Sequence, residues 1–105
     1  MCNEYSIIIT TYPGKESAKE IAVQLVEHKM AASVQMFPIE SVYRWKGEVC
    51  EANEIVLMIR TKTGLFSEVS SFIKSNHPYE LPEIIQIPIA DGLPDYLCWI
   101  GENTK

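Results

Sequence analysis

Residues 32–62 read ASVQMFPIESVYRWKGEVCEANEIVLMIRTK, and this stretch decides the fold. Two runs of apolar, β-branched and aromatic residues flank Trp45-Lys46-Gly47-Glu48, which is the pattern of two strands joined by a turn. Gly47 supplies the positive φ that a tight hairpin turn requires. The sequence therefore predicts one long β-hairpin.

The return arm of this hairpin carries apolar side chains on both faces. Strand alternation places Ile55, Leu57 and Ile59 on one face, and Val56 and Met58 on the other. A strand of this kind is expected to be covered on both sides.

The two arms are unusually long for a chain of this size. Each would run for about a dozen residues, roughly twice the usual strand length. The far half carries Tyr43, Trp45, Val49 and Cys50, and would leave a monomer as an apolar ribbon with open edges. We therefore expect another chain to bury the hairpin tip.

The remaining segments alternate between strand and helix periodicity. Their order predicts an α+β, ferredoxin-like β-α-β-β-α-β domain over residues 1–105, with a long central hairpin and a short C-terminal helix. Beside the hairpin we expect strands at residues 5–11 and 84–89, and helices at residues 15–29, 63–77 and 94–100.

Composition excludes several classes of protein. The chain has 105 residues, 47% of them apolar, which argues for one folded domain and against disorder. Its net charge of −5 argues against a broad nucleic-acid surface. Because no apolar run has transmembrane length and no signal-like N-terminus is visible, we expect no membrane partner and a cytoplasmic location.

The three cysteines are Cys2, Cys50 and Cys98. Their odd number, wide spacing and lack of a C-x-x-C argue against a disulfide framework or a clustered zinc site. Cys50 and Cys98 are soft potential ligands. Cys98, beside Trp99, is expected to be a small buried apolar residue, and Cys2 to lie on a mobile terminus.

Four local strings together resemble the CutA family of divalent-cation tolerance proteins. They are AASV at 31–34, SVYRWKGE at 41–48, HPYELPE at 77–83 and DYLCWI at 95–100. The resemblance covers almost the whole chain. It implies a compact homotrimer of ferredoxin-like protomers joined partly by the long hairpins. It also implies a function in divalent-cation tolerance, binding of copper or another divalent metal ion, and no established catalytic reaction.

This chain departs from the metal-linked pattern of some bacterial members of that family. Thr10 stands where they carry a cysteine at the end of the first strand, and Ser33 stands where a cysteine often follows the alanine pair. Asn76-His77 replaces a pair of histidines. Of those ligand types, only His77 remains at its position.

His77, Glu80 and Glu83 are the candidate metal ligands. Imidazole and carboxylate groups on a stiff proline-containing loop can bind a divalent cation. The structural alternative is that His77 caps the end of the second helix. Glu80 and Glu83 would then be solvated or would form salt bridges between subunits. No catalytic motif is present, and we expect a binding protein, not an enzyme.

A second candidate site is a cleft between subunits. Its expected residues are aromatic or basic: Tyr43, Arg44, Trp45, Lys46, Tyr79, Tyr96 and Trp99. Such a cleft can receive a small anionic ligand, as in the similarly built PII-type signalling proteins, although aromatic residues more often form interface core. A third possibility is a rigid trimeric platform for a partner protein.

Overall fold

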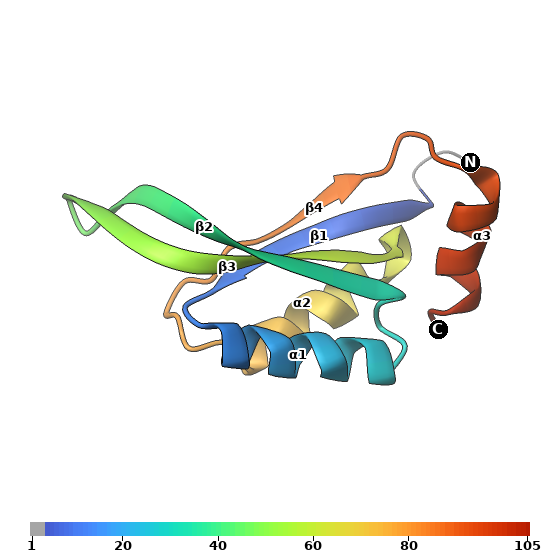
Figure 1. Ribbon diagram of the computed structural model, residues 1–105, viewed down its shortest axis with the longest axis horizontal. Helices are drawn as coiled ribbons and strands as arrows, with labels where there is room; N and C mark the ends of the chain where they lie inside the picture. Colours follow the sequence, from blue (N-terminus) through green and yellow to red (C-terminus); the bar gives the residue numbers. More distant parts are fainter. Residues whose placement is uncertain (1–3) are drawn as a thin grey trace.

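The structure is a computed structural model that describes residues 4–105 (Figure 1). Its strands are β1 (Tyr5–Tyr12), β2 (Ser33–Trp45), β3 (Glu48–Lys62) and β4 (Ile84–Pro88). Its helices are α1 (Lys15–Glu27), α2 (Phe66–Ser75), which follows a 3₁₀ turn at Thr63–Leu65, and α3 (Pro94–Glu102). The order of elements is the predicted one.

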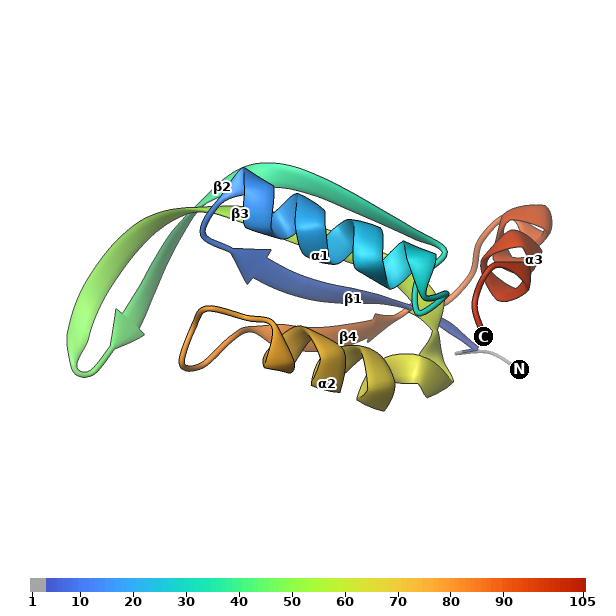
Figure 2. The same cartoon turned by 90° about the horizontal axis from the view of Figure 1, so that it is seen from below.

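The strands form one antiparallel sheet in the order β2-β3-β1-β4. Both α1 and α2 lie against the same face of this sheet (Figures 1 and 2). On the face of β3 away from the helices, Val56 is buried and Met58 is partly exposed, so the expected cover on both sides is present only in part within one subunit. On the face away from the helices, Phe37, Ile85 and Ile87 are nearly half exposed.

The core lies between the helices and the covered face of the sheet. The helical spacing of α1 buries Ala18, Ile21, Ala22 and Leu25 along one face. They meet strand residues of one alternation phase, such as Ile8, Leu57 and Ile59, all fully buried. The register aligns Ile8 with Ile59, so these side chains stand on one face.

The hairpin turns at Lys46 and Gly47, whose φ angles are +51° and +83°. Two successive positive φ angles match the twist of the flanking strands, which explains the tight connection. The pairing of β1 with β3 ends where Tyr12 meets Ile55. Beyond that point β3 pairs only with β2 across residues 48–54, and the hairpin runs on unsupported to one end of a molecule 44 Å long.

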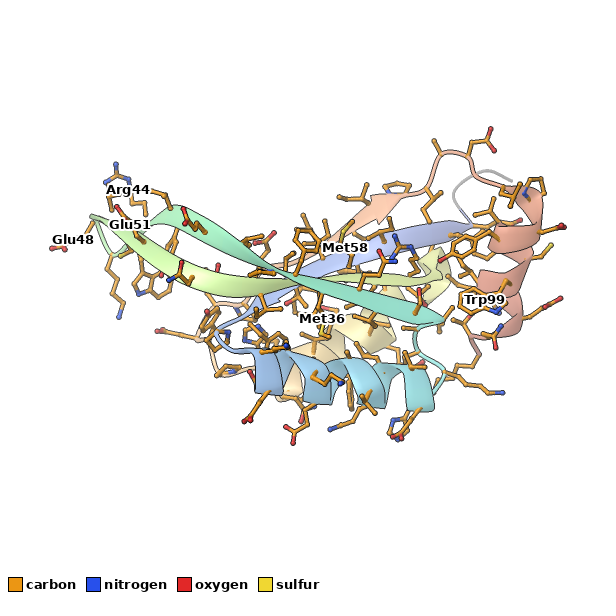
Figure 3. The ribbon with its side chains drawn as sticks, in the orientation of Figure 1. Met36, Arg44, Glu48, Glu51, Met58 and Trp99 are labelled. Carbon is orange, nitrogen blue, oxygen red and sulfur yellow. The ribbon has the colours of Figure 1, made fainter. Side chains whose placement is uncertain are left out.

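Different elements form the two ends of the molecule. Arg44 and Glu48 lie at the hairpin tip, and Trp99 lies on α3 at the opposite end (Figure 3). At the hairpin end, Val42 is 70% exposed and Val49 is 64% exposed. The predicted apolar ribbon is therefore present.

The C-terminal helix corrects one expectation. Pro94 occupies its first turn, where a missing backbone N–H costs nothing. Of its side chains, Ile100 is buried but Cys98 is exposed, so Cys98 is not a core residue. Cys2 lies outside the described residues. Among residues 4–105, no helix is both long and apolar enough to cross a membrane.

A matched pair of valine variants tests this core. Val69 in α2 is fully buried and Val23 in α1 is 43% exposed. Because both are helical, Val→Ala changes helix propensity equally, and only burial differs. We expect Val69→Ala to lower the free energy of unfolding by about 2 kcal/mol. Val23→Ala should stay within about 0.5 kcal/mol of the parent.

The measurement is urea denaturation at one protein concentration. Equal effects of the two substitutions would contradict the placement of the core.

Candidate functional site

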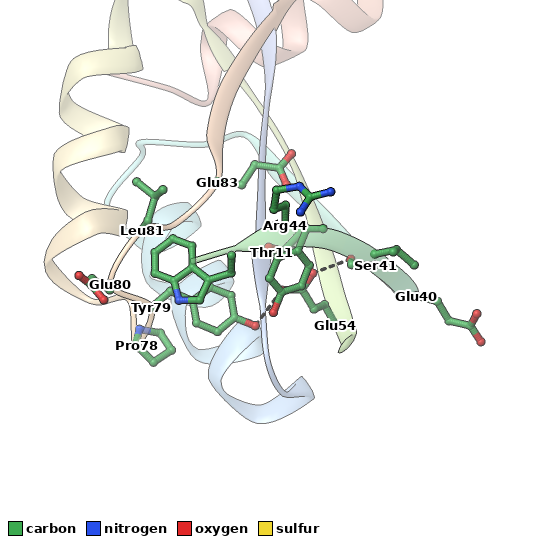
Figure 4. A pocket seen from close by; sticks show the side chains of 13 residues that line it. Thr11, Glu40, Ser41, Arg44, Glu54, Pro78, Tyr79, Glu80, Leu81 and Glu83 are labelled. Atoms are coloured by element: carbon green, nitrogen blue, oxygen red, sulfur yellow. Dashed lines mark hydrogen bonds between the residues drawn. The ribbon is translucent and has the colours of Figure 1, made fainter. Parts of the chain in front are cut away.

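A cavity of about 760 Å³ opens between the distal hairpin and the loop at residues 78–83 (Figure 4). We call it the hairpin cleft. Tyr43 and Trp45 line it from β2, and Tyr79 lines it from the loop. Alternation along β2 places Ser41, Tyr43 and Trp45 on one face, and the register places Glu54 on that same face.

The polar lining of the hairpin cleft is strongly acidic. Four carboxylates, those of Glu40, Glu54, Glu80 and Glu83, stand against the single guanidinium of Arg44. An anionic ligand would meet repulsion there. The expectation that basic residues would prepare this cleft for an anion is therefore not supported by its charge.

Glu54 is the buried member of this group, with 9% of its surface exposed. The Ser41 hydroxyl donates to its Oε1 at 2.6 Å, and the Tyr79 hydroxyl donates to its Oε2 at 2.7 Å (Figure 4). These lengths are typical of hydroxyl groups donating to an ionised carboxylate. Glu54 thus ties β2, β3 and the loop together.

His77 lies next to this network and has a structural role. Its Nε2 donates to the Thr11 carbonyl at 2.7 Å, and its Nδ1 accepts the Tyr79 backbone N–H at 3.1 Å. Its ring also lies 4.2 Å from that of Tyr12. A neutral imidazole protonated on Nε2 satisfies both hydrogen bonds.

Burial shifts the pKa of each ring in this group in the direction that favours its neutral form. It lowers the pKa of His77 from 6.5, against opposing effects of the Thr11 hydrogen bond and the Glu54 charge. It raises the pKa of Tyr12 to about 12. Burial and then the hydrogen bond to Glu54 raise the pKa of Tyr79 far above its usual range.

The structure does not assemble His77, Glu80 and Glu83 as ligands of one ion. Within residues 4–105, no group of three or more His, Cys, Asp or Glu side chains is arranged to hold a metal. Glu80 and Glu83 are exposed and line the hairpin cleft, whereas both His77 nitrogens are already bonded. One subunit alone therefore does not fit a transition-metal site.

The alternative role for His77 as a helix cap is wrong. Asn76 ends α2 instead: its side-chain amide donates to the Phe72 carbonyl and its backbone N–H donates to Ile73. The other two departures from the metal-linked pattern are Thr10 and Ser33. Thr10 is fully buried on the helix-covered face, and the hydroxyls of Thr10 and Ser33 are buried without a partner among the described residues.

Within one subunit, the residues expected in a cleft between subunits lie in two places. Tyr43, Arg44, Trp45 and Tyr79 do come together in the hairpin cleft. The Lys46 ammonium instead lies 5.7 Å from the ring centroid of Trp45. Tyr96 and Trp99 stack on each other, with centroids 5.5 Å apart, on α3 at the other end of the molecule.

Sequence reasoning missed Glu54, Ser41 and Thr11. A signal for Glu54 was available, because it directly precedes the apolar run at residues 55–59 and shares an alternation phase with Val56 and Met58. A carboxylate on an otherwise apolar strand face needs a partner. No local pattern identified that partner as Tyr79.

Comparisons with known proteins all lead to the same family. The family model of the CutA1 divalent ion tolerance protein matches residues 6–103. A divalent-cation tolerance protein CutA from Thermus thermophilus is 43% identical over 99 residues, which are 93% of this chain and 96% of that protein. Mouse CutA is 41% identical over 101 residues, and here 95% of the chain spans only 57% of the relative.

The fold agrees equally well. The structure of a periplasmic divalent cation tolerance protein CutA from Archaeoglobus fulgidus superposes with a TM-score of 0.94 at 39% sequence identity. The superposition covers 96% of this chain and 99% of that one. The structure of the divalent cation tolerance protein from Thermus thermophilus gives a TM-score of 0.93 at 42% identity, with the same coverage.

The pKa of His77 generates a prediction for stability. Because folding lowers this pKa, the folded state binds the proton more weakly than the unfolded chain. The stabilisation is complete above 6.5, the ordinary pKa of histidine, and is lost as pH falls below it. His77→Gln should therefore flatten the decline in unfolding free energy between about pH 8 and about pH 5.5.

The matched control is His28→Gln, since His28 is exposed at the end of α1. Urea denaturation across that pH range measures both variants. An unchanged slope in His77→Gln, or an equal flattening in His28→Gln, would refute this role for His77.

Proposed function

Because this chain belongs to the CutA1 divalent ion tolerance family, we propose that it serves divalent-cation tolerance as a reversible cation-binding homotrimer and not as an enzyme. The observation that carries the proposal is the match to that family across residues 6–103. The acidic hairpin cleft supports it, because exposed carboxylates attract divalent cations.

The unsupported hairpin is the argument for assembly. Among residues 4–105, nothing pairs with one edge of β3 across residues 48–54 or with the outer edge of β4. Different surfaces at different edges suit a heterologous contact, which closes into a ring when the rotation allows. The exposed apolar residues Val42 and Val49 would be covered in such a ring. Three subunits is the number that the family resemblance implies.

Glu80 and Glu83 are the proposed cation ligands of this chain. Both are exposed at the hairpin cleft, whereas His77 can join them only after Nδ1 releases the Tyr79 N–H. Further ligands would come from a neighbouring subunit. Copper is the most informative probe, because a given set of nitrogen and oxygen ligands binds Cu²⁺ most tightly among first-row divalent ions.

The comparisons do not favour the PII-like alternative, and the acidic lining of the hairpin cleft argues against an anionic ligand. The cytoplasmic location stays a prediction. The name of the Archaeoglobus relative describes that protein as periplasmic.

Charge at the hairpin tip should break the trimer. We expect the parent to have a mass near three times 11.9 kDa in solution. In the double variant Val42→Glu, Val49→Glu, burial of two carboxylates would oppose assembly and yield monomers. Light scattering after size-exclusion chromatography measures this mass.

Val23→Glu on α1 is the control, because it adds charge at an exposed valine outside the hairpin. A monomeric parent would contradict the proposed assembly.

Copper titration by calorimetry tests the proposed cation ligands. Saturable binding to the parent should weaken in the double variant Glu80→Gln, Glu83→Gln, and weaken less in His77→Gln. The control Glu16→Gln, Glu20→Gln removes two exposed carboxylates from α1 and should bind normally. A trimeric parent with no saturable binding would defeat the cation-binding proposal and leave the assembly proposal intact.

A further inference from the structure

Glu54 carries a buried charge that has no cationic partner. Buried carboxylates are normally paired with a cation, because removal from water is costly for an ion. Among residues 4–105, Glu54 forms no salt bridge, and its two hydrogen bonds come from neutral hydroxyls. The nearby His77 is held in its neutral form by its own hydrogen bonds. The chain thus leaves a buried negative charge uncompensated at the wall of a cavity.

The cavity beside Glu54 has the size of a small-molecule site. Its volume of about 760 Å³ lies within the usual range for ligand pockets, about 300–1,000 Å³. Glu54 retains acceptor capacity, because a carboxylate offers about four lone-pair positions and two are used. Glu80 and Glu83 add acceptors at the rim.

The aromatic lining selects the kind of cation. Tyr43, Trp45 and Tyr79 line the same cavity, and aromatic rings attract cations over their faces. Trp45 already has one such contact, because Lys46 Nζ lies 5.7 Å from its ring centroid. Protonated phenol groups and an indole are poor ligands for a divalent metal, but the three rings suit a flat or alkylated cation.

We infer that the hairpin cleft binds a small organic cation whose guanidinium or primary ammonium group pairs with Glu54 and whose body lies against Tyr43, Trp45 and Tyr79. This ligand class goes beyond the divalent cations of the proposed function. Arg44 would oppose the ligand as the one cationic side chain in the lining.

Calorimetry with butylguanidine tests this inference against butylurea, which has the same planar shape and no charge. We expect saturable binding of butylguanidine to the parent protein and none of butylurea. Trp45→Leu should weaken binding about tenfold. Trp99→Leu is the matched control, since Trp99 is also partly exposed but lies on α3. Arg44→Gln should tighten binding.

Glu54→Gln is the decisive charge variant, because the amide keeps the shape of the side chain and removes its charge. It should abolish binding of butylguanidine. Arg44→Gln and the two ligands keep the inference falsifiable if Glu54→Gln fails to fold. Equal binding of both ligands, no binding to the parent, or no effect of Trp45→Leu beyond that of Trp99→Leu would overturn it.

Oligomeric mass is recorded on the same samples. If a basic side chain of a neighbouring copy occupied the cleft, Glu54→Gln would dissociate the assembly without added ligand, and that result would also overturn the inference. Copper titration of Trp45→Leu separates the two proposals, because loss of the aromatic ring should leave metal binding unchanged.

Discussion

The mismatch in strand length within one sheet is the constraint on which the other features depend. β3 has 15 residues and β2 has 13, but the neighbouring β1 has 8. Once β1 ends at Tyr12, no third strand and no helix from the described part of the chain lies beneath the hairpin (Figure 2). It is then free to curve, and its edges are left unpaired. The same mismatch creates both the hairpin cleft and the surface proposed for assembly.

Glu54 occupies the point where this free segment begins. Ser41 joins its carboxylate to β2, and Tyr79 joins it to the loop after α2. Tyr79 also donates its backbone N–H to His77, which in turn holds the end of β1 through the Thr11 carbonyl. The carboxylate and the imidazole therefore fix the loop on the sheet. This explains why the one histidine retained from the metal-linked pattern has no free nitrogen.

The sequence reading succeeded where local periodicity carries the information. The helix at residues 15–29, the turn glycine at Gly47 and the alternation of Ile55 to Ile59 each depend on local geometry, and each prediction was confirmed. It failed at His77, which was considered as a cap of the nearby helix end but bonds the Thr11 carbonyl and the Tyr79 N–H instead. The reading named Tyr79 for the cleft but not Glu54, whose charge interrupts an apolar strand face.

By itself, then, the sequence determined the order of strands and helices, the length of the hairpin, and the family. Each of these features depends on the spacing of residues that lie only a few positions apart along the chain. Only the tertiary structure decided which side chains meet. Glu54 and Tyr79 are 25 positions apart, and His77 and Thr11 are 66 apart. Contacts across such distances arise from the path of the chain in space, which no local spacing records.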